Sequence, residues 1–252
     1  MKDRLISARN LRLALLAMAF ATGVCLAMIV GRTMFLRPLE YPGLRHRIEL
    51  PGLIWNLFLA WIPLLLALLI HALSSHFQRR FGRLAVCGIA WFLFFPNAPY
   101  LVTDLVHWKN HFPVPKWFDL LMIMSFAWTG LMLGYLSLYL MQELVRRWKG
   151  RRWSWSFVVL VLALSSFGIY LGRFQRLNSW DVVARPMGLL SDVARSADFA
   201  QSPEALAFSL TFFTFSFFSY LTLFAHTHLH GLAEPAASKS VAPSLPRGEE
   251  AG

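Results

Sequence analysis

The chain has 252 residues, of which 57% are hydrophobic and 15% are charged. Soluble domains carry about 25% charged residues, and here the apolar residues lie in long blocks, which excludes an ordinary soluble globular protein. The formal net charge of +11 is typical of nucleic-acid-binding proteins, but the lysine and arginine clusters flank the apolar blocks, as they do in the loops of membrane proteins. We therefore expect an integral membrane protein that has membrane lipids as partners and binds no nucleic acid.

Five apolar segments are long enough to cross a membrane. A helix needs about 20 predominantly apolar residues to span roughly 30 Å of hydrocarbon. The segments that meet this length are residues 11–30, 53–73, 120–141, 153–171 and 205–225. Each is predicted to be a transmembrane helix.

A sixth span is predicted between the second and third of these segments. Residues 84–95 are apolar but too few to cross a bilayer, and they run into the sequence FPNAPY. Pro96 and Pro99 each lack a backbone donor and obstruct the preceding turn, so we predict a break near Asn97. Beyond it, residues 100–108 resume helical periodicity. The predicted fold class is all-α: a polytopic integral membrane helical bundle of six transmembrane helices, with the third helix broken by prolines.

The predicted domain organisation has three parts. Residues 1–10 form the N-terminus, residues 11–230 form the six-helix transmembrane domain, and residues 231–252 form a disordered tail that is rich in Ala, Pro, Ser and Glu. With six spans, the side that carries both termini holds 14 of the 24 lysine and arginine residues, including the dense run RRWKGRR at residues 146–152. The positive-inside rule then predicts that both termini are cytoplasmic.

Two pairs of glycines four residues apart lie in the predicted spans. They are Gly130 with Gly134, and Gly168 with Gly172. Small residues at this spacing allow helices to approach one another closely. We expect these glycines to pack within the monomer.

Polar residues that could carry chemistry gather in two segments that the predicted topology places on the outer side of the membrane. The candidates in the first segment, which follows the helix break, are Asn97, Tyr100, Asp104 and His107. The candidates in the second segment, which follows the fifth span, are Arg173, Arg176, Asn178 and Asp181. Because both segments face the same compartment, we expect them to form one site.

These two segments resemble a family of uncharacterised bacterial membrane proteins, the domain of unknown function 1361 (DUF1361). The resemblance is carried by FPNAPYLVTDLVHW at residues 95–108 and by GRFQRLNSWD at residues 172–181, and it covers residues 55–226. It implies a multi-pass protein of a bacterial membrane, which we expect to be the cytoplasmic (inner) membrane. It implies no activity, catalytic residue or cofactor, so cofactors and protein partners stay unknown.

Asp104 and His107 are three residues apart, so on a helix they share a face. They are candidates for catalysis as an acid and base pair, or for two ligands of a metal ion whose other ligands would come from His111, Asp119 or Asp181. The alternative is that Asp104 pairs locally with an arginine, because an unpaired charge near hydrocarbon is costly. Both interpretations fit the sequence.

Arg173 and Arg176 lie one helical turn apart and could bind a phosphate or carboxylate from two sides. The alternatives are an ion pair of either arginine with Asp104, and snorkelling toward the headgroups.

The sequence therefore predicts a polar site on the outer face that binds or processes an anionic lipid-like substrate, and it leaves open whether the protein is an enzyme. The alternative functions are a small transporter with its pathway near Pro96 and Pro99, and an accessory subunit of another membrane complex.

Two further groups of polar residues are weaker candidates. Asn56 and His71 lie inside the second span, each within about one turn of its end, where water can reach them. His226, His228 and His230 lie near the end of the last span, and His226 with His230 has the spacing of a metal-binding pair. Histidines at a helix C-terminus favour the helix dipole in any case, so we expect no metal site there.

Overall fold

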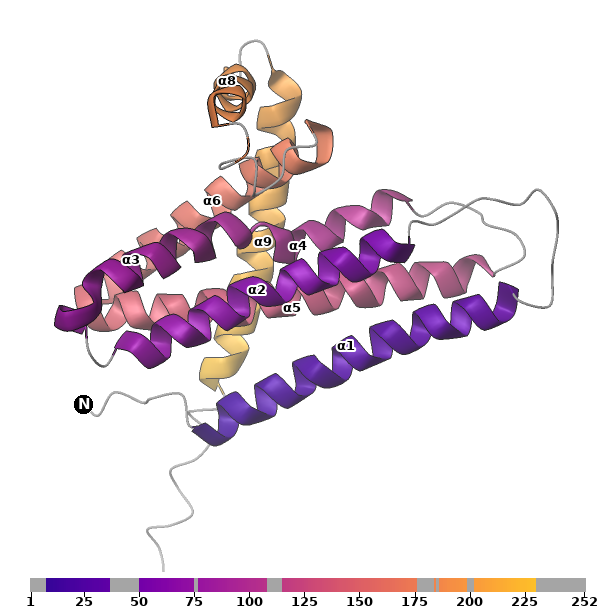
Figure 1. Ribbon diagram of the computed structural model, residues 1–252, viewed down its shortest axis with the longest axis horizontal. Coiled ribbons are helices and arrows are strands. Elements are labelled where there is room, and N and C mark those ends of the chain that lie inside the picture. The colour runs from indigo at the N-terminus through magenta and orange to yellow at the C-terminus, as the bar shows by residue number, and fades with distance from the viewer. Residues whose placement is uncertain are drawn as a thin grey trace, which may run out of the picture.

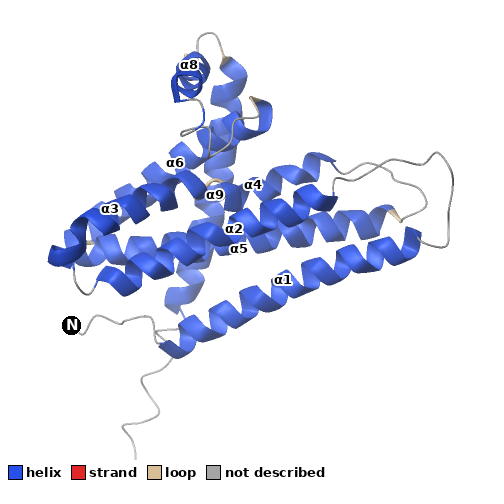
Figure 2. Ribbon diagram, in the orientation of Figure 1, coloured by secondary structure: helices blue, strands red, loops and turns tan. Residues whose placement is uncertain are grey.

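The structure of the chain, a computed structural model, describes residues 8–36, 50–74, 77–107, 115–175, 184, 186–198 and 202–229. Within these ranges the regular elements are all helices, without a strand (Figure 2). Six stretches of the described residues are long and apolar enough to cross a membrane. The predicted all-α membrane bundle with six spans is confirmed, whereas the predicted tail at residues 231–252 lies outside the described residues.

The spans follow one another back and forth between two ends of the bundle (Figure 1). They are α1 (Ala8–Leu36), α2 (Leu50–Leu73), a broken third span, α5 (Lys116–Lys149), α6 (Arg151–Phe174) and α9 (Pro203–Leu229). The central helix α5 packs against α1, α2 and α6, and α9 packs along α6. We call one end the Gly150 end, after the turn between α5 and α6, and the other the Asp104 end.

The third span is broken as predicted. Its elements are α3 (Phe77–Phe94), the single turn α4 (Asn97–Tyr100) and the 3-10 helix η2 (Leu101–His107). Nδ2 of Asn97 donates to the carbonyl oxygen of Phe94 at 3.0 Å, and the N–H of Tyr100 donates to the carbonyl oxygen of Pro96 at 3.0 Å. The backbone groups around the prolines are thus satisfied by protein, as irregular backbone at membrane depth requires.

Glycines of α5 and α6 pack on this break. A Cβ at Gly130 would lie 2.6 Å from the carbonyl oxygen of Ala98 and 2.4 Å from Cδ1 of Leu101. A Cβ at Gly134 would lie 3.1 Å from Cβ of Ala98, and Gly168 lies against the proline that opens the break. The expected packing within the monomer is confirmed for these three glycines. It brings α5 and α6 onto α4 and so positions the residues that follow it.

Two spans are longer than their apolar runs predict, because charged residues inside them are paired. The ion pair between Arg32 and Asp119 joins the C-terminal part of α1 to the first turn of α5. At the other end of α5, Glu143 pairs with Arg146 and Arg147 three and four residues later, which is the spacing that stabilises a helix. Both helices therefore continue through residues that hydropathy alone places in loops.

The outside of the bundle is covered by large apolar side chains. Among the described residues, Phe20 and Leu16 of α1 are 76% and 67% exposed, and Phe218 of α9 is 69% exposed. A soluble monomer rarely exposes apolar surface on this scale. These side chains face the lipid of a membrane.

One helix lies in a stretch without a predicted element. It is α8 (Pro186–Ala197), beside the first turns of α9 at the Asp104 end (Figure 1). Leu189 and Val193 pack against α6 and α9, while Met187 and Leu190 are 78% and 63% exposed. An amphipathic helix with an uncovered apolar side is typical of a helix that lies in the membrane interface.

Candidate functional site

A charged pair joins the third and fifth spans at the Asp104 end. Nη1 of Arg173, in the last turn of α6, lies 3.1 Å from Oδ1 of Asp104 on η2, and the two side chains are only 12% and 6% exposed. Nδ2 of Asn56, on α2, donates to Oδ2 of Asp104 at 3.1 Å. Three helices that are distant in the sequence therefore meet at one carboxylate. We call Asn56, Tyr100, Asp104 and Arg173 the Asp104 centre.

The guanidinium of Arg173 is held by more than the carboxylate. Nη2 donates to the carbonyl oxygen of Thr103 at 2.9 Å, and Nη1 donates to the hydroxyl of Tyr100 at 3.3 Å. Its Cζ lies 5.6 Å from the centroid of the Tyr100 ring, in the range of a cation–π contact. Arg173 is thus oriented by a charge, a carbonyl, a hydroxyl and an aromatic face.

The break in the third span explains why these groups converge. After Asn97 the chain coils as one α-turn and then as a 3-10 helix, which has three residues per turn. Asp104 and His107 therefore occupy equivalent positions one turn apart, as the sequence predicts. The side chain of His107 lies outside the described residues, so its role stays a prediction.

The geometry restricts what Asp104 does chemically. Both carboxylate oxygens accept hydrogen bonds, one from Arg173 and one from Asn56. A proton transferred to Asp104 would have to reach the carboxylate beside these two donors. The alternative in which Asp104 pairs with an arginine is confirmed, and the partner is Arg173.

The structure brings together only part of the predicted site. Tyr100, Asp104 and Arg173 are in contact, whereas Asn97 closes the helix break through its bond to Phe94. The predicted residues outside the described part of the chain are Arg176, Asn178 and Asp181. Their place in the site stays a prediction.

Two polar contacts escape prediction from the sequence. The first is that of Asn56 with Asp104, since an amide near a span end also fits a residue reached by water. The second is the ion pair between Arg32 and Asp119, whose side chains are buried, at 3% and 1% exposed. Nε of Arg32 lies 2.7 Å from Oδ1 of Asp119, and Nη2 lies 3.3 Å from Oδ2. The only signal for it is the position of Arg32 two residues beyond an apolar run.

The described residues contain no group of three or more His, Cys, Asp or Glu side chains placed to hold a metal ion. Asp119, a predicted further ligand, has both oxygens engaged by Arg32. At the end of α9, Nδ1 of His226 lies 3.1 Å from the carbonyl oxygen of Thr222. The side chains of His228 and His230 lie outside the described part.

A family model described as a protein of unknown function, DUF1361, matches residues 55–219 of the chain. The matched segment contains the whole Asp104 centre and begins after the first span. Comparisons with curated proteins and with solved structures gave no match.

Proposed function

The chain belongs to the DUF1361 family, a family of membrane proteins to which no function is assigned, and we propose that it binds an anionic amphiphile at the Asp104 end. The observation that carries the proposal is the nearly buried pair of Asp104 and Arg173, built from separate helices at the end of the spans. Charged residues in membrane spans are costly, and they mark functional sites by default. This pair lies inside the family-matched segment.

The surroundings of the pair support an amphiphile as the ligand. An arginine held in one orientation is suited to bidentate binding of a phosphate or carboxylate. Beside it, Val106 on η2 and Phe174 on α6 are 74% and 56% exposed and offer apolar surface to an acyl or other hydrocarbon chain. A charged anchor next to exposed apolar side chains matches a ligand that has an anionic group and a hydrocarbon part.

The remaining predicted residues extend this site in the proposal. Arg176 follows Arg173 by one helical turn and would take a second oxygen of the anionic group. Asn178 and Asp181 would contact the polar part of the ligand. In an enzymatic version, His107 or Asp104 would act as the general base, and Asn97 and Tyr100 would line the site.

We infer the location of the site from the distribution of charge. In the described part of the chain, most of the lysine and arginine residues lie at the Gly150 end, so the positive-inside rule puts that end in the cytoplasm. Both termini would then be cytoplasmic and the Asp104 end would face outward from a bacterial cytoplasmic membrane. The transporter alternative gains no comparable support, because Gly130 and Gly134 of α5 pack directly on the helix break where its pathway was predicted.

The proposal is tested by measuring which amphiphiles stay bound to purified variants. We expect Arg173→Gln to lower the amount of anionic lipid-like ligand that co-purifies in mild detergent by about tenfold, since hydrogen bonds to charged groups contribute about 1.5 to 3 kcal/mol. Native mass spectrometry counts the bound molecules. The matched control is Arg195→Gln on α8, because Arg195 lies at the same end in an exposed pair 4.0 Å from Asp192.

A second variant separates binding from folding. Replacing Asp104 and Arg173 together by leucine removes both charges, and such neutral replacements of buried pairs are often tolerated. We expect this double variant to fold, as judged by its melting temperature, and to lack the ligand. Retention of the ligand by the folded double variant would show that the charged pair has only a structural role.

A further inference from the structure

The α5–α6 turn at the Gly150 end carries a dense set of positive charges. The two helices meet at Gly150, whose φ of 90° is a backbone conformation that favours glycine. Its N–H donates to the carbonyl oxygen of Arg146 and closes α5. The five cations of the turn are Arg146, Arg147, Lys149, Arg151 and Arg152, all of them exposed. They lie within seven consecutive residues.

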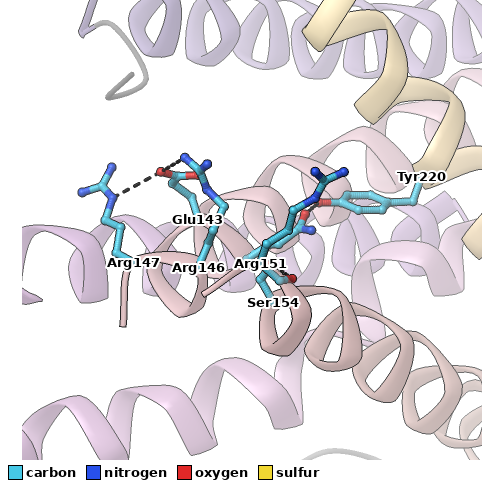
Figure 3. Close-up of polar contacts among 7 residues, drawn as sticks. Glu143, Arg146, Arg147, Arg151, Ser154 and Tyr220 are labelled. Atoms are coloured by element: carbon cyan, nitrogen blue, oxygen red, sulfur yellow. Dashed lines mark hydrogen bonds and ion pairs between the residues drawn. The ribbon is translucent and has the colours of Figure 1, made fainter. Parts of the chain in front are cut away.

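One buried carboxylate organises two of these cations. Nε and Nη2 of Arg146 lie 2.8 Å from the two oxygens of Glu143, and Nε of Arg147 lies 3.3 Å from one of them. The Glu143 side chain is 7% exposed, whereas those of Arg146 and Arg147 are 43% and 27% exposed. Figure 3 shows the two arginines reaching Glu143 from either side. One carboxylate against five cations leaves an excess of four positive charges.

The base of the turn is held rigidly. The hydroxyl of Tyr220, on α9, donates to Oε1 of the buried Gln142, which ties α9 to the last turns of α5. The hydroxyl of Ser154 donates to the carbonyl oxygen of Arg151 at 2.8 Å and secures the first turn of α6 (Figure 3). The positive charges are therefore displayed on a preformed surface.

Two tryptophans set the level of this surface relative to the membrane. Trp148 and Trp153 flank the turn and are 43% and 66% exposed. Tryptophan side chains in membrane proteins prefer the headgroup level. The cations thus lie at the depth of the lipid phosphates.

We propose that the α5–α6 turn is a binding site for the phosphate groups of anionic phospholipids in the leaflet at the Gly150 end. Lys149, Arg151 and Arg152 contact the headgroups, and Glu143 holds Arg146 and its neighbour in place beneath them. A zwitterionic lipid brings its own ammonium group into this positive field, so the site favours lipids with net negative charge. The site is at the opposite end from the Asp104 centre and does not depend on the function proposed there.

The test measures lipid binding by native mass spectrometry in mild detergent, with phosphatidylglycerol and phosphatidylcholine as probes. We expect the wild type to bind phosphatidylglycerol preferentially. The triple variant Lys149→Gln, Arg151→Gln and Arg152→Gln should weaken that binding by about tenfold or more, since each cation near anionic lipid contributes severalfold. Equal binding of both lipids by the wild type, or an unchanged affinity of this variant, would overturn the proposal.

A charge-matched variant shows whether location matters. Arg9, Arg12 and Arg83 are exposed cations near the beginnings of α1 and α3, at the same end of the bundle. Replacing all three by glutamine removes the same charge, and we expect the affinity for phosphatidylglycerol to change by less than about twofold. An equal loss in both triple variants would mean that overall charge, rather than the turn, attracts the lipid. Displacement of the lipid by soluble glycerol phosphate would equally contradict a lipid site.

The substitution Glu143→Gln tests whether lipid binding depends on arginines oriented by Glu143 or only on the net positive charge of the turn. The substitution adds one unit of positive charge, so attraction by charge alone predicts tighter binding of phosphatidylglycerol. We expect weaker binding, because Arg146 and Arg147 lose the group that orients them. The melting temperature of the variant verifies that it is folded, and tighter binding by a folded variant would refute the organising role of Glu143.

Discussion

Replacing Arg32 by leucine is expected to destabilise the protein strongly and to loosen its first helix. The guanidinium of Arg32 binds both oxygens of Asp119, and the two side chains are 3% and 1% exposed. Removing one member of such a buried pair costs about 3 to 5 kcal/mol. Tryptophan fluorescence during heating in mild detergent should show a melting temperature about 10 °C lower.

The reason for a large effect is that α1 has few other polar contacts with the bundle. Sγ of Cys25 lies 3.4 Å from the hydroxyl oxygen of Thr129, and Nε1 of Trp61 donates to the hydroxyl of Thr22. Only a minor part of α1 is buried. Loss of the ion pair therefore removes a large share of the polar contacts that hold this helix on the bundle.

Cys25 offers a direct readout of that loosening. It is fully buried in the wild type, so in a Cys87→Ser background it should react slowly with N-ethylmaleimide. We expect faster labelling of Cys25 in the Arg32→Leu variant, and recovery of both stability and protection when Asp119→Leu is added, because the neutral pair can pack. Arg195→Leu, in an exposed pair, should change stability by no more than about 0.5 kcal/mol. Unchanged melting and labelling in Arg32→Leu would show that the pair does not hold α1.

The architecture was predictable because lipid imposes a strong rule on sequence. Spans need long apolar runs, and Pro96 and Pro99 mark the break in the third span through their missing backbone donors. The rule fails where charge is neutralised inside a helix. Arg32 and Glu143 lie within α1 and α5 because each has a partner, and hydropathy contains no information about partners.

The candidate site was predictable only in part for the same reason. The face shared by Tyr100 and Asp104 follows from helical spacing, and the topology places Arg173 on the same side of the membrane. The contact of Asn56 with Asp104 depends on how α2 packs against the broken span. The broken span is in turn positioned by close contacts with α5, such as those of Gly130 with Ala98 and Leu101, and no local pattern reveals which residue a glycine faces.

Gly130→Ala is expected to be the most disruptive small substitution in the bundle. Its added Cβ would lie 2.6 Å from the carbonyl oxygen of Ala98 and 2.4 Å from Cδ1 of Leu101. A side chain end can rotate, but the carbonyl belongs to the backbone of α4, so α4 and α5 must move apart. Overpacking of this kind costs about 1 to 3 kcal/mol, which thermal unfolding followed by tryptophan fluorescence would measure.

The same displacement should reach the Asp104 centre, because α4 leads directly into η2. A graded series of alanine substitutions tests whether displacement of α4 disturbs the Asp104 centre. At Gly134 the nearest atom would be 3.1 Å away and must yield only a little, and at Gly88 of α3 no atom would lie within 4 Å. We expect stability and amphiphile binding to fall most for Gly130→Ala and less for Gly134→Ala. Gly88→Ala should be neutral or slightly stabilising, since alanine is the better helix residue. If Gly130→Ala and Gly88→Ala melt and bind alike, α5 does not hold the broken span in the position from which Asp104 meets Arg173.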